Sequence, residues 1–363
     1  MTAYVIAARR TAVVPRGGAF AKLSIEDLAS PVIAALLDDA GLSPQDVDEV
    51  ICSNALGLGG TPARRVALAA RLPQRVAGLS IDRQCVGGLD AILIARALVD
   101  SGAAKVVIAG GVESYSRRPI RLMTDPKGGP SKPYDQPPFT PWPDRDPNVT
   151  DAAAALAARL GISRADQDNW SVHSHAKAVA AQKWLEVELV PVLGQMRDAF
   201  TRPLNPALAQ RAGVLSGSIT AANTAVAADA AAFVIVSSQG LAQGRGMRIV
   251  SGVTLGSNPQ EPALGAVAAM YRALEMAHSG PNNLTIVELM EAYAVQAIAC
   301  AEALGLDLGL VNPGGGAVAR GHPIGASGAI LAVRLFHELQ AGRGLAAISA
   351  AGGLGTAVVF EKA

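Results

Sequence analysis

The 363-residue chain is poor in aromatic and charged residues, which make up 4% and 17% of it. Half of the residues are hydrophobic, so the apolar content comes mainly from Ala, Val, Leu and Ile. This composition excludes an intrinsically disordered chain and is typical of helices that cover a buried sheet. At about 150 residues per domain, the length predicts roughly two to three domains.

The chain also lacks an excess of positive or negative charge. The chain has 31 Lys and Arg residues against 30 Asp and Glu residues, which leaves a formal charge of +1. A chain so close to neutral has no general attraction for nucleic acid or for an anionic membrane. We therefore expect neither as a partner, and an anionic ligand has to be bound locally.

Long apolar runs and paired cysteines are missing too. No run reaches the roughly 18 apolar residues of a membrane-spanning helix, and the apolar start 1–14 is interrupted by Arg9 and lacks the order of a signal peptide. We expect a cytoplasmic protein. The three cysteines Cys52, Cys85 and Cys300 show no CxxC spacing, which argues against disulfides and a zinc site. We expect free thiols and no metal site.

The first third of the chain alternates predicted strands and helices. Apolar segments at 4–8, 47–52 and 105–109 are predicted strands, and the periodic segments 25–40 and 87–101 are predicted helices. Alternation of this kind predicts a parallel sheet.

The chain resembles itself at a spacing of about 240 residues. Residues 91–96 are similar to 329–334, and each predicted helix leads through a short strand to a Gly-Gly pair, at 110–111 and 352–353. The simplest interpretation is two copies of one βαβαβ-type half. Chance similarity between alanine-rich helices is the alternative.

A proline-rich segment interrupts the first copy. Nine prolines fall within 119–147, too many for the interior of a sheet or helix. We interpret 117–212 as an inserted loop domain. The N-terminal half then comprises 1–116 plus 213–244, and the C-terminal half comprises 245–363.

Cys85 lies between a predicted strand at 80–83 and the helix that Gly87-Gly88 opens. Backbone N–H groups at a helix start favour an anion, so this position can lower the pKa of a thiol below its usual value of about 8.5. A cysteine in an apolar chain is more often a small core residue, an interpretation that suits Cys52 and Cys300 better.

A nucleophilic cysteine needs a base or a cationic partner. Of the five histidines, only His322 has a glycine-rich loop around it, at 314–328, just before a predicted helix. It occupies the place in the second copy that Cys85 occupies in the first. Two copies packed about a pseudo-twofold axis would bring the side chains together, and His322 Nε2 could polarise the thiol or donate to a carbonyl oxygen.

At these residues the chain resembles the thiolase family, almost from end to end. The matching segments are 10–11, 82–89, 110–114, 229–231, 291–294 and 321–323. The resemblance implies an α/β thiolase fold of two pseudo-twofold-related βαβαβαββ halves, in a layered α-β-α-β-α arrangement with an inserted loop domain. It also implies a homodimer or homotetramer in which Cys85 forms an acyl-enzyme from acyl-CoA and His322 activates it.

Two positions depart from the family pattern. Ser349 stands where the family has a second catalytic cysteine, and an alcohol is a far weaker acid than a thiol. Met290 stands where the family has an asparagine that holds an oxyanion-hole water. By resemblance, the backbone N–H groups of Cys85 and Ala351 form the second oxyanion hole.

The resemblance also implies where CoA binds. CoA and acyl-CoA are expected as substrates, with no tightly bound cofactor. The insertion matches the family's CoA-holding loop domain, and Arg117 and Arg118 are candidates for contacts with the CoA phosphates. Ser251 matches the serine that touches the pantetheine arm.

These residues predict a thiolase-like acyltransferase that is readily acylated on Cys85 and passes the acyl group to CoA or a carbon acceptor, with its thiolysis or Claisen step impaired. Two alternatives remain open. One is a decarboxylative ketosynthase-like condensing enzyme, which needs no second cysteine. The other is a non-catalytic CoA-binding subunit of an acyltransferase complex.

Overall fold

The computed structural model describes residues 2–242 and 246–363. Its main sheet has ten strands in the order β12-β13-β14-β11-β1-β10-β5-β3-β4, with β2 paired to β10. The strands are β1 (Ala3–Arg10), β2 (Val14–Pro15), β3 (Glu49–Ser53), β4 (Leu79–Ile81), β5 (Val106–Ser114), β10 (Ala228–Ser238), β11 (Met247–Gly256), β12 (Leu284–Leu289), β13 (Gly342–Ala350) and β14 (Leu354–Lys362).

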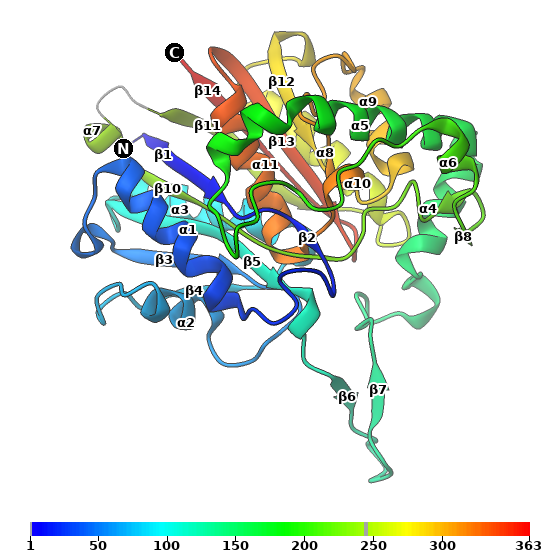
Figure 1. The fold of residues 1–363 in the computed structure, drawn as a ribbon, viewed down its shortest axis with the longest axis horizontal. Coiled ribbons are helices and arrows are strands. Elements are labelled where there is room, and N and C mark those ends of the chain that lie inside the picture. The colour runs from blue at the N-terminus through cyan, green and yellow to red at the C-terminus, as the bar shows by residue number, and fades with distance from the viewer. Residues whose placement is uncertain (1, 243–245) are drawn as a thin grey trace.

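Helices cover both faces of this sheet (Figure 1). The helices of the described ranges, some of which lie outside the sheet layers, are α1 (Ile25–Ala40), α2 (Pro62–Ala69), α3 (Gly87–Asp100), α4 (Val149–Leu160), α5 (Arg164–Leu185), α6 (Pro206–Gln210), α7 (Gln239–Ala242), α8 (Gly265–Met276), α9 (Ala294–Leu304), α10 (Ala317–Arg320) and α11 (Ile324–Glu338). In the described ranges, none is long and apolar enough to cross a membrane.

The sheet consists of two runs with the same topology. In the first run β1 is antiparallel to β10, β10 is antiparallel to β5, and β5 is parallel to β3. In the second run β11, β14, β13 and β12 pair in the same way. The runs meet where β1 pairs with β11 over two residues, Tyr4 and Val5. The internal repeat predicted from the sequence is therefore confirmed, although the sheet is mixed and not parallel as the alternation of elements suggested.

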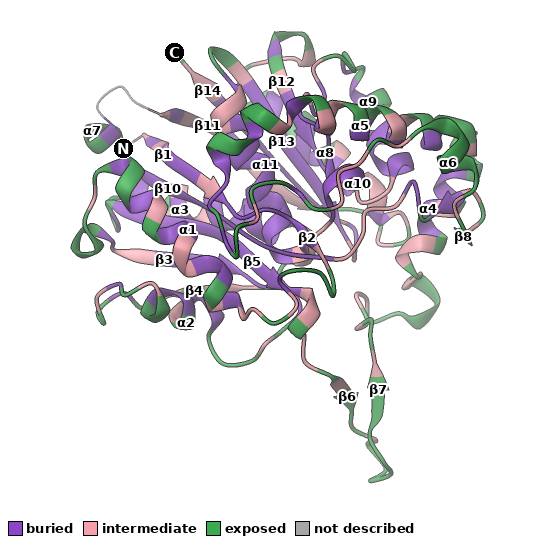
Figure 2. Ribbon diagram, viewed as in Figure 1, coloured by how far each residue is buried: buried purple, intermediate pink, exposed green. Residues whose placement is uncertain are grey.

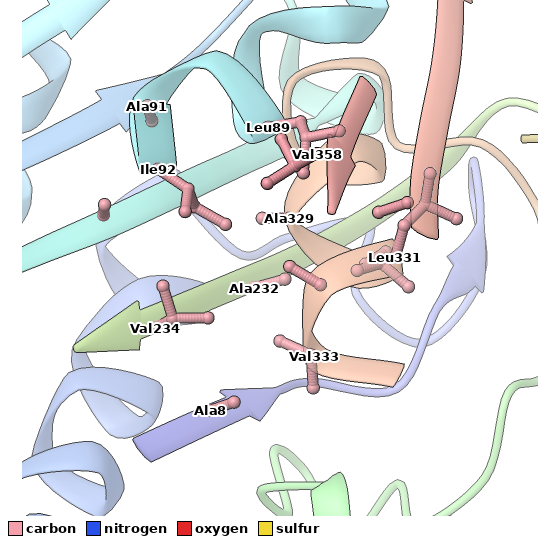
Figure 3. Close-up of a cluster of buried hydrophobic side chains, with 14 of the residues drawn as sticks. Ala8, Leu89, Ala91, Ile92, Ala232, Val234, Ala329, Leu331, Val333 and Val358 are labelled. Carbon is pink, nitrogen blue, oxygen red and sulfur yellow. The ribbon is translucent and has the colours of Figure 1, made fainter. Parts of the chain in front are cut away.

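The two central helices, α3 and α11, contact each other between the runs. Leu89 and Ile92 of α3 and Leu331 and Val333 of α11 share a buried cluster with Val358 of β14 (Figure 3). Helices α1 and α2 pack on the outer face of the first run, and α8 and α9 on the outer face of the second. The result is the predicted α-β-α-β-α layering, with burial concentrated in the sheet and the central helices (Figure 2).

Local signals set the ends of α1. Ser24 accepts a hydrogen bond from the backbone of Asp27 in a capping box, and Gly41 ends the helix with a left-handed φ of 64°. The predicted helix over 25–40 is confirmed at both ends.

The two Gly-Gly pairs play different roles, contrary to the equivalence that their sequence spacing suggested. The strand predicted to end before Gly110 continues as β5 to Ser114. A Cβ on Gly111 would lie 1.9 Å from the carbonyl oxygen of Gly325, so glycine is needed where the start of α11 crosses the strand. Gly352 and Gly353 instead form the turn between β13 and β14, with φ of 78° and 74°.

Strands β5 and β10 are neighbours, and the chain between them, 115–227, leaves the main sheet. It contains α4, α5 and α6, a small hairpin of β8 (Val214–Ser216) and β9 (Ile219–Thr220), and the hairpin of β6 (Arg121–Met123) and β7 (Lys132–Tyr134). The β6–β7 hairpin projects away from the body of the molecule (Figure 1). The domain boundaries inferred above, with an insertion over 117–212, stay a prediction.

Candidate active site

Cys85 lies in a single 3₁₀ turn directly before α3. The preceding residue, Gln84, has a left-handed φ of 52°, which is uncommon for a residue other than glycine. Its backbone N–H and its side-chain Nε2 both donate to Asp82 Oδ1 at 2.9 Å, and these bonds hold the turn. Cys85 is therefore held, half-buried, at the start of α3.

His322 lies just before α11, in the equivalent place of the second half. Its backbone N–H donates to the carbonyl of Val226 at 2.7 Å. The start of α11 is held by Glu113 of β5, whose Oε2 accepts from Gly325 N at 2.9 Å. The structure brings His322 Nε2 to 3.2 Å from Cys85 Sγ.

The hydrogen bonds around His322 select its tautomer. His322 Nδ1 lies 2.6 Å from Ser327 Oγ, and that hydroxyl donates its single proton to the carbonyl of Pro323 at 3.0 Å. With its proton assigned to the Pro323 carbonyl, Ser327 Oγ accepts from Nδ1–H, and this tautomer of the neutral ring leaves Nε2 unprotonated. The lone pair of Nε2 faces the thiol and can take its proton.

Burial decides the resting charge of the pair. It raises the pKa of Cys85 to about 12, and the backbone N–H groups of Cys85 and Ala351 only partly oppose this rise. Burial also lowers the pKa of His322 to about 4. These directions oppose the expectation that the helix start lowers the thiol pKa, and they favour a neutral thiol and a neutral imidazole at rest, so that the proton moves during attack.

The turn between β13 and β14 supplies a backbone donor. The N–H group of Ala351 and that of Cys85 both interact with the Cys85 sulfur, which is the arrangement that a second oxyanion hole requires. The left-handed positions of this turn fall on Gly352 and Gly353, so Ala351 fits without backbone strain.

A cavity of about 430 Å³ lies in front of Cys85 and His322. Two polar side chains in its wall were not singled out from the sequence, Thr224 and Gln296. Thr224 Oγ1 and Gln296 Nε2 are both buried without a hydrogen-bond partner, whereas Gln296 Oε1 accepts from Ala292 N at 3.0 Å. The only sequence signal for Gln296 was its position one helical turn after the segment 291–294. These two groups can hold a substrate oxygen or a water.

Ser349 lines the same cavity, but its hydroxyl is already engaged. It donates to the carbonyl of Ala263 and accepts from the N–H of Ala266 at the start of α8, both at 2.9 Å. The nearby Cys300 Sγ lies 3.5 Å from the same Ala263 oxygen, and burial raises the pKa of Cys300 to about 12. Neither group is suited to exchange a proton near neutral pH.

Met290 does not reach the cavity. Its side chain is buried in the cluster between the two sheet runs, and its N–H donates to the carbonyl of Ala347 at 2.9 Å. Ser251 of β11 is likewise buried, and its hydroxyl donates to the carbonyl of Ala273 in α8 at 2.6 Å. Neither residue lines the cavity, although the cluster that contains Met290 packs against Cys85.

The two predicted phosphate contacts differ in position. Arg117 donates to the carbonyl of Lys22 at 3.3 Å on an exposed surface. Arg118 forms an ion pair with Asp135 at 3.0 Å and lines a second cavity of about 370 Å³. The two cavities share Arg121 and Asp135, so Arg118 is paired with a residue that borders both. Nowhere in the described ranges do three or more His, Cys, Asp or Glu residues form a group that could hold a metal ion.

The chain matches known proteins along almost its whole length. Residues 3–240 match the family model described as the thiolase N-terminal domain, and residues 245–362 match the thiolase C-terminal domain. The chain is 36% identical to the acetyl-CoA acetyltransferase of Cupriavidus necator over 99% of its own length and 98% of that protein. It is also 36% identical to that of Chromobacterium violaceum over 100% of both chains.

A solved structure agrees with the sequence matches. The crystal structure of the Bacillus anthracis acetyl-CoA acetyltransferase superposes with a TM-score of 0.91 at 29% sequence identity, covering 99% of this chain and 98% of that one. Because the matches include both halves and the cysteine–histidine pair lies where the two halves meet, the chain belongs to the thiolase family.

Proposed function

We propose that the protein is a thiolase-type acyltransferase that takes an acyl group from acyl-CoA onto Cys85. The observation that carries this proposal is the 3.2 Å approach of His322 Nε2 to Cys85 Sγ within the cavity. The names of its relatives, acetyl-CoA acetyltransferases, support the same reaction class. CoA and acyl-CoA are substrates in this proposal, and no tightly bound cofactor is required.

The acylation step uses groups that the chain provides. Cys85 Sγ attacks the thioester carbon while its proton passes to His322 Nε2, and the carbonyl oxygen becomes an oxyanion beside the N–H groups of Cys85 and Ala351. Collapse breaks the bond between the carbonyl carbon and the CoA sulfur, and His322 returns the proton to that sulfur. The products are free CoA and the acyl-enzyme.

The second half-reaction is the weak step. A Claisen condensation requires removal of a proton from the carbon next to a second thioester, and the hydroxyl of Ser349 is engaged with Ala263 and Ala266. The apolar Met290 supplies no side-chain donor to the cavity. We infer that the acyl-enzyme forms readily and that thiolysis or Claisen transfer is slow.

Substrate binding and assembly complete the proposal. Arg118, which lines the second cavity, is the better candidate for a CoA phosphate, because Arg117 and Ser251 line neither cavity. A homodimer or homotetramer would cover the β6–β7 hairpin, where Leu122 and Met123 are 58% and 51% exposed. A cytoplasmic location fits a nucleophile that must stay reduced.

The test is a covalent loading assay. The protein is incubated with a panel of acyl-CoAs, and the intact mass is measured. We expect an increase equal to one acyl group, absent in Cys85→Ala and retained in the matched control Cys300→Ala. No increase, or one that survives Cys85→Ala, would defeat the proposal.

Two further measurements, carbon dioxide release and CoA affinity, separate the two alternative functions. Turnover of malonyl-CoA with release of carbon dioxide would identify a decarboxylative ketosynthase-like enzyme. Affinity for CoA without acylation would identify a non-catalytic CoA-binding subunit of an acyltransferase complex.

A further inference from the structure

The active-site cavity contains a cation that the acylation step does not use. Arg121, the first residue of β6, lines both cavities. Its Nη2 donates to the carbonyl of Ala55 at 3.2 Å, the one hydrogen bond that its guanidinium makes within the described residues. Asp135, the acid that borders the same two cavities, is paired with Arg118 at 3.0 Å. Most of the five N–H donors of Arg121 are therefore available to a ligand.

Arg121 is held in a defined position relative to Cys85. The carbonyl that it contacts belongs to a loop whose Ala55 and Leu56 N–H groups donate to Glu113 at 3.0 and 3.3 Å. The same carboxylate accepts from Gly325 N at 2.9 Å, at the start of the helix that follows His322. Glu113 thus links the loop under Arg121 to the catalytic pair.

The surroundings of Arg121 favour an anion at one end of an apolar site. In the wall of the second cavity, Arg16, Arg118 and Arg121 outnumber Asp135, and Arg16 and Arg118 both lie over the ring of Tyr115. The cavity that holds Cys85 is lined by apolar side chains as well, among them Leu56, Pro137 and Phe139. A guanidinium beside such a wall binds a carboxylate through two parallel N–H donors.

We propose that Arg121 selects acyl groups that carry a carboxylate at the far end of the chain, so that the preferred substrates are CoA thioesters of dicarboxylic acids. This inference rests on the proposed function, because it requires the thioester carbon to be at Cys85. The bound acyl chain then runs along the apolar wall with its carboxylate paired to Arg121. A CoA phosphate offers the same anionic oxygens, and the experiment is designed to separate the two sources.

The experiment compares acyl groups that differ only in the terminal carboxylate. Loading of Cys85 is followed by intact mass with glutaryl-CoA against pentanoyl-CoA and with adipyl-CoA against hexanoyl-CoA. We expect the wild-type protein to load the dicarboxylic member of at least one pair about tenfold faster or more, the gain that a charge-assisted pair provides. In Arg121→Met this ratio falls to about one.

The matched control is Lys127→Met, which removes a positive charge from the exposed tip of the same hairpin, outside both cavities. We expect it to keep the wild-type ratio. Equal ratios in Arg121→Met and wild type would refute the inference, as would a wild-type ratio of one. Absence of loading with every thioester would instead refute the proposed function itself.

Acyl-pantetheine thioesters, which lack the CoA phosphates, identify the source of the anion. If Arg121 binds the acyl carboxylate, the preference for glutaryl over pentanoyl persists with pantetheine thioesters and is still lost in Arg121→Met. If Arg121→Met slows all CoA thioesters equally and leaves all pantetheine thioesters unaffected, the residue binds a phosphate and the inference is overturned.

Discussion

The two halves of the molecule share a sheet topology but carry different reactive side chains at equivalent helix starts. The start of α3 presents Cys85 and the start of α11 presents His322, and both border one cavity. After β5 the first half extends into the long segment 115–227, whereas after β13 the second half turns tightly at 351–353 into β14. The symmetric scaffold brings the two helix starts together, while the unequal connections supply cavity walls from one half and a backbone donor from the other.

The halves also differ in how complete their chemistry is. Cys85 of the first half has an acceptor for its proton in His322 and a donor in the Ala351 N–H. The corner of the second half around Ser349 instead has a hydroxyl that caps α8. Substitutions of His322, which forms the contact between the halves, and of Ser349 therefore test this difference.

Replacing His322 with Asn should have the largest effect. The buried thiol, with its pKa raised to about 12, then has no base to accept its proton. We expect the rate of Cys85 loading, followed by intact mass, to fall roughly a hundredfold or more. The control His278→Asn, on the exposed turn after α8, should load at the wild-type rate. Loading by His322→Asn within about threefold of wild type would show that the halves do not cooperate in acylation.

Replacing Ser349 with Cys should reduce the difference between the halves, because it gives the second half a thiol as well. A thiol at position 349, which unlike Cys300 lines the cavity and faces the N–H of Ala266, is a far stronger acid than the hydroxyl that it replaces, so we expect CoA-dependent cleavage of acetoacetyl-CoA to rise about tenfold or more. The absorbance of the substrate's enolate reports this rate. Ser349→Ala, the control, removes the α8 cap and should lower the free energy of unfolding by about 1 kcal/mol without any gain in cleavage. Equal activity in the two variants would exclude this corner as an acid/base position.

A change of pH near neutrality should have the smallest effect on the acylation rate, but the pH profile of Cys85 alkylation should have a distinctive shape. Alkylation by iodoacetamide requires the thiolate, and because burial raises the pKa of Cys85 to about 12, the alkylation rate should climb through pH 7–9 without a plateau. Acylation uses neutral His322, whose pKa is about 4, so its rate should stay flat near neutral pH and fall only as the ring becomes protonated in acid. Cys85→Ala should not react, because Cys52 and Cys300 are buried. A plateau in alkylation near pH 6 would indicate a thiolate–imidazolium pair instead.

Local and repeating features of this fold were predictable from the sequence. The ends of α1 follow from the Ser24 capping box and Gly41, which act within a few residues. The repeat was visible because α3 and α11 are buried in the same central layer and so carry similar apolar residues. Cys85 and His322 could be paired before the structure was known because each lies in a distinctive segment at the start of a repeated helix.

Other features depended on distant parts of the chain. The need for glycine at position 111 depends on the approach of Gly325, more than 200 residues later. Ser251 carried a family-like signal, yet its hydroxyl is held by Ala273 behind the sheet. Thr224 and Gln296 had no strong local signal because their significance lies in buried polar atoms without a hydrogen-bond partner, on two residues that line the same cavity.

The sequence by itself determined which residues could be nucleophile and base, because side-chain chemistry and helix-start signals are local properties. Only the tertiary structure decided their protonation and their neighbours. Burial, which the sequence does not measure, keeps Cys85 and His322 neutral at rest. Packing of the segment 115–227 against both halves placed Arg121 in the same cavity, since a contact between residues far apart in the chain exists only once the layers have closed around it.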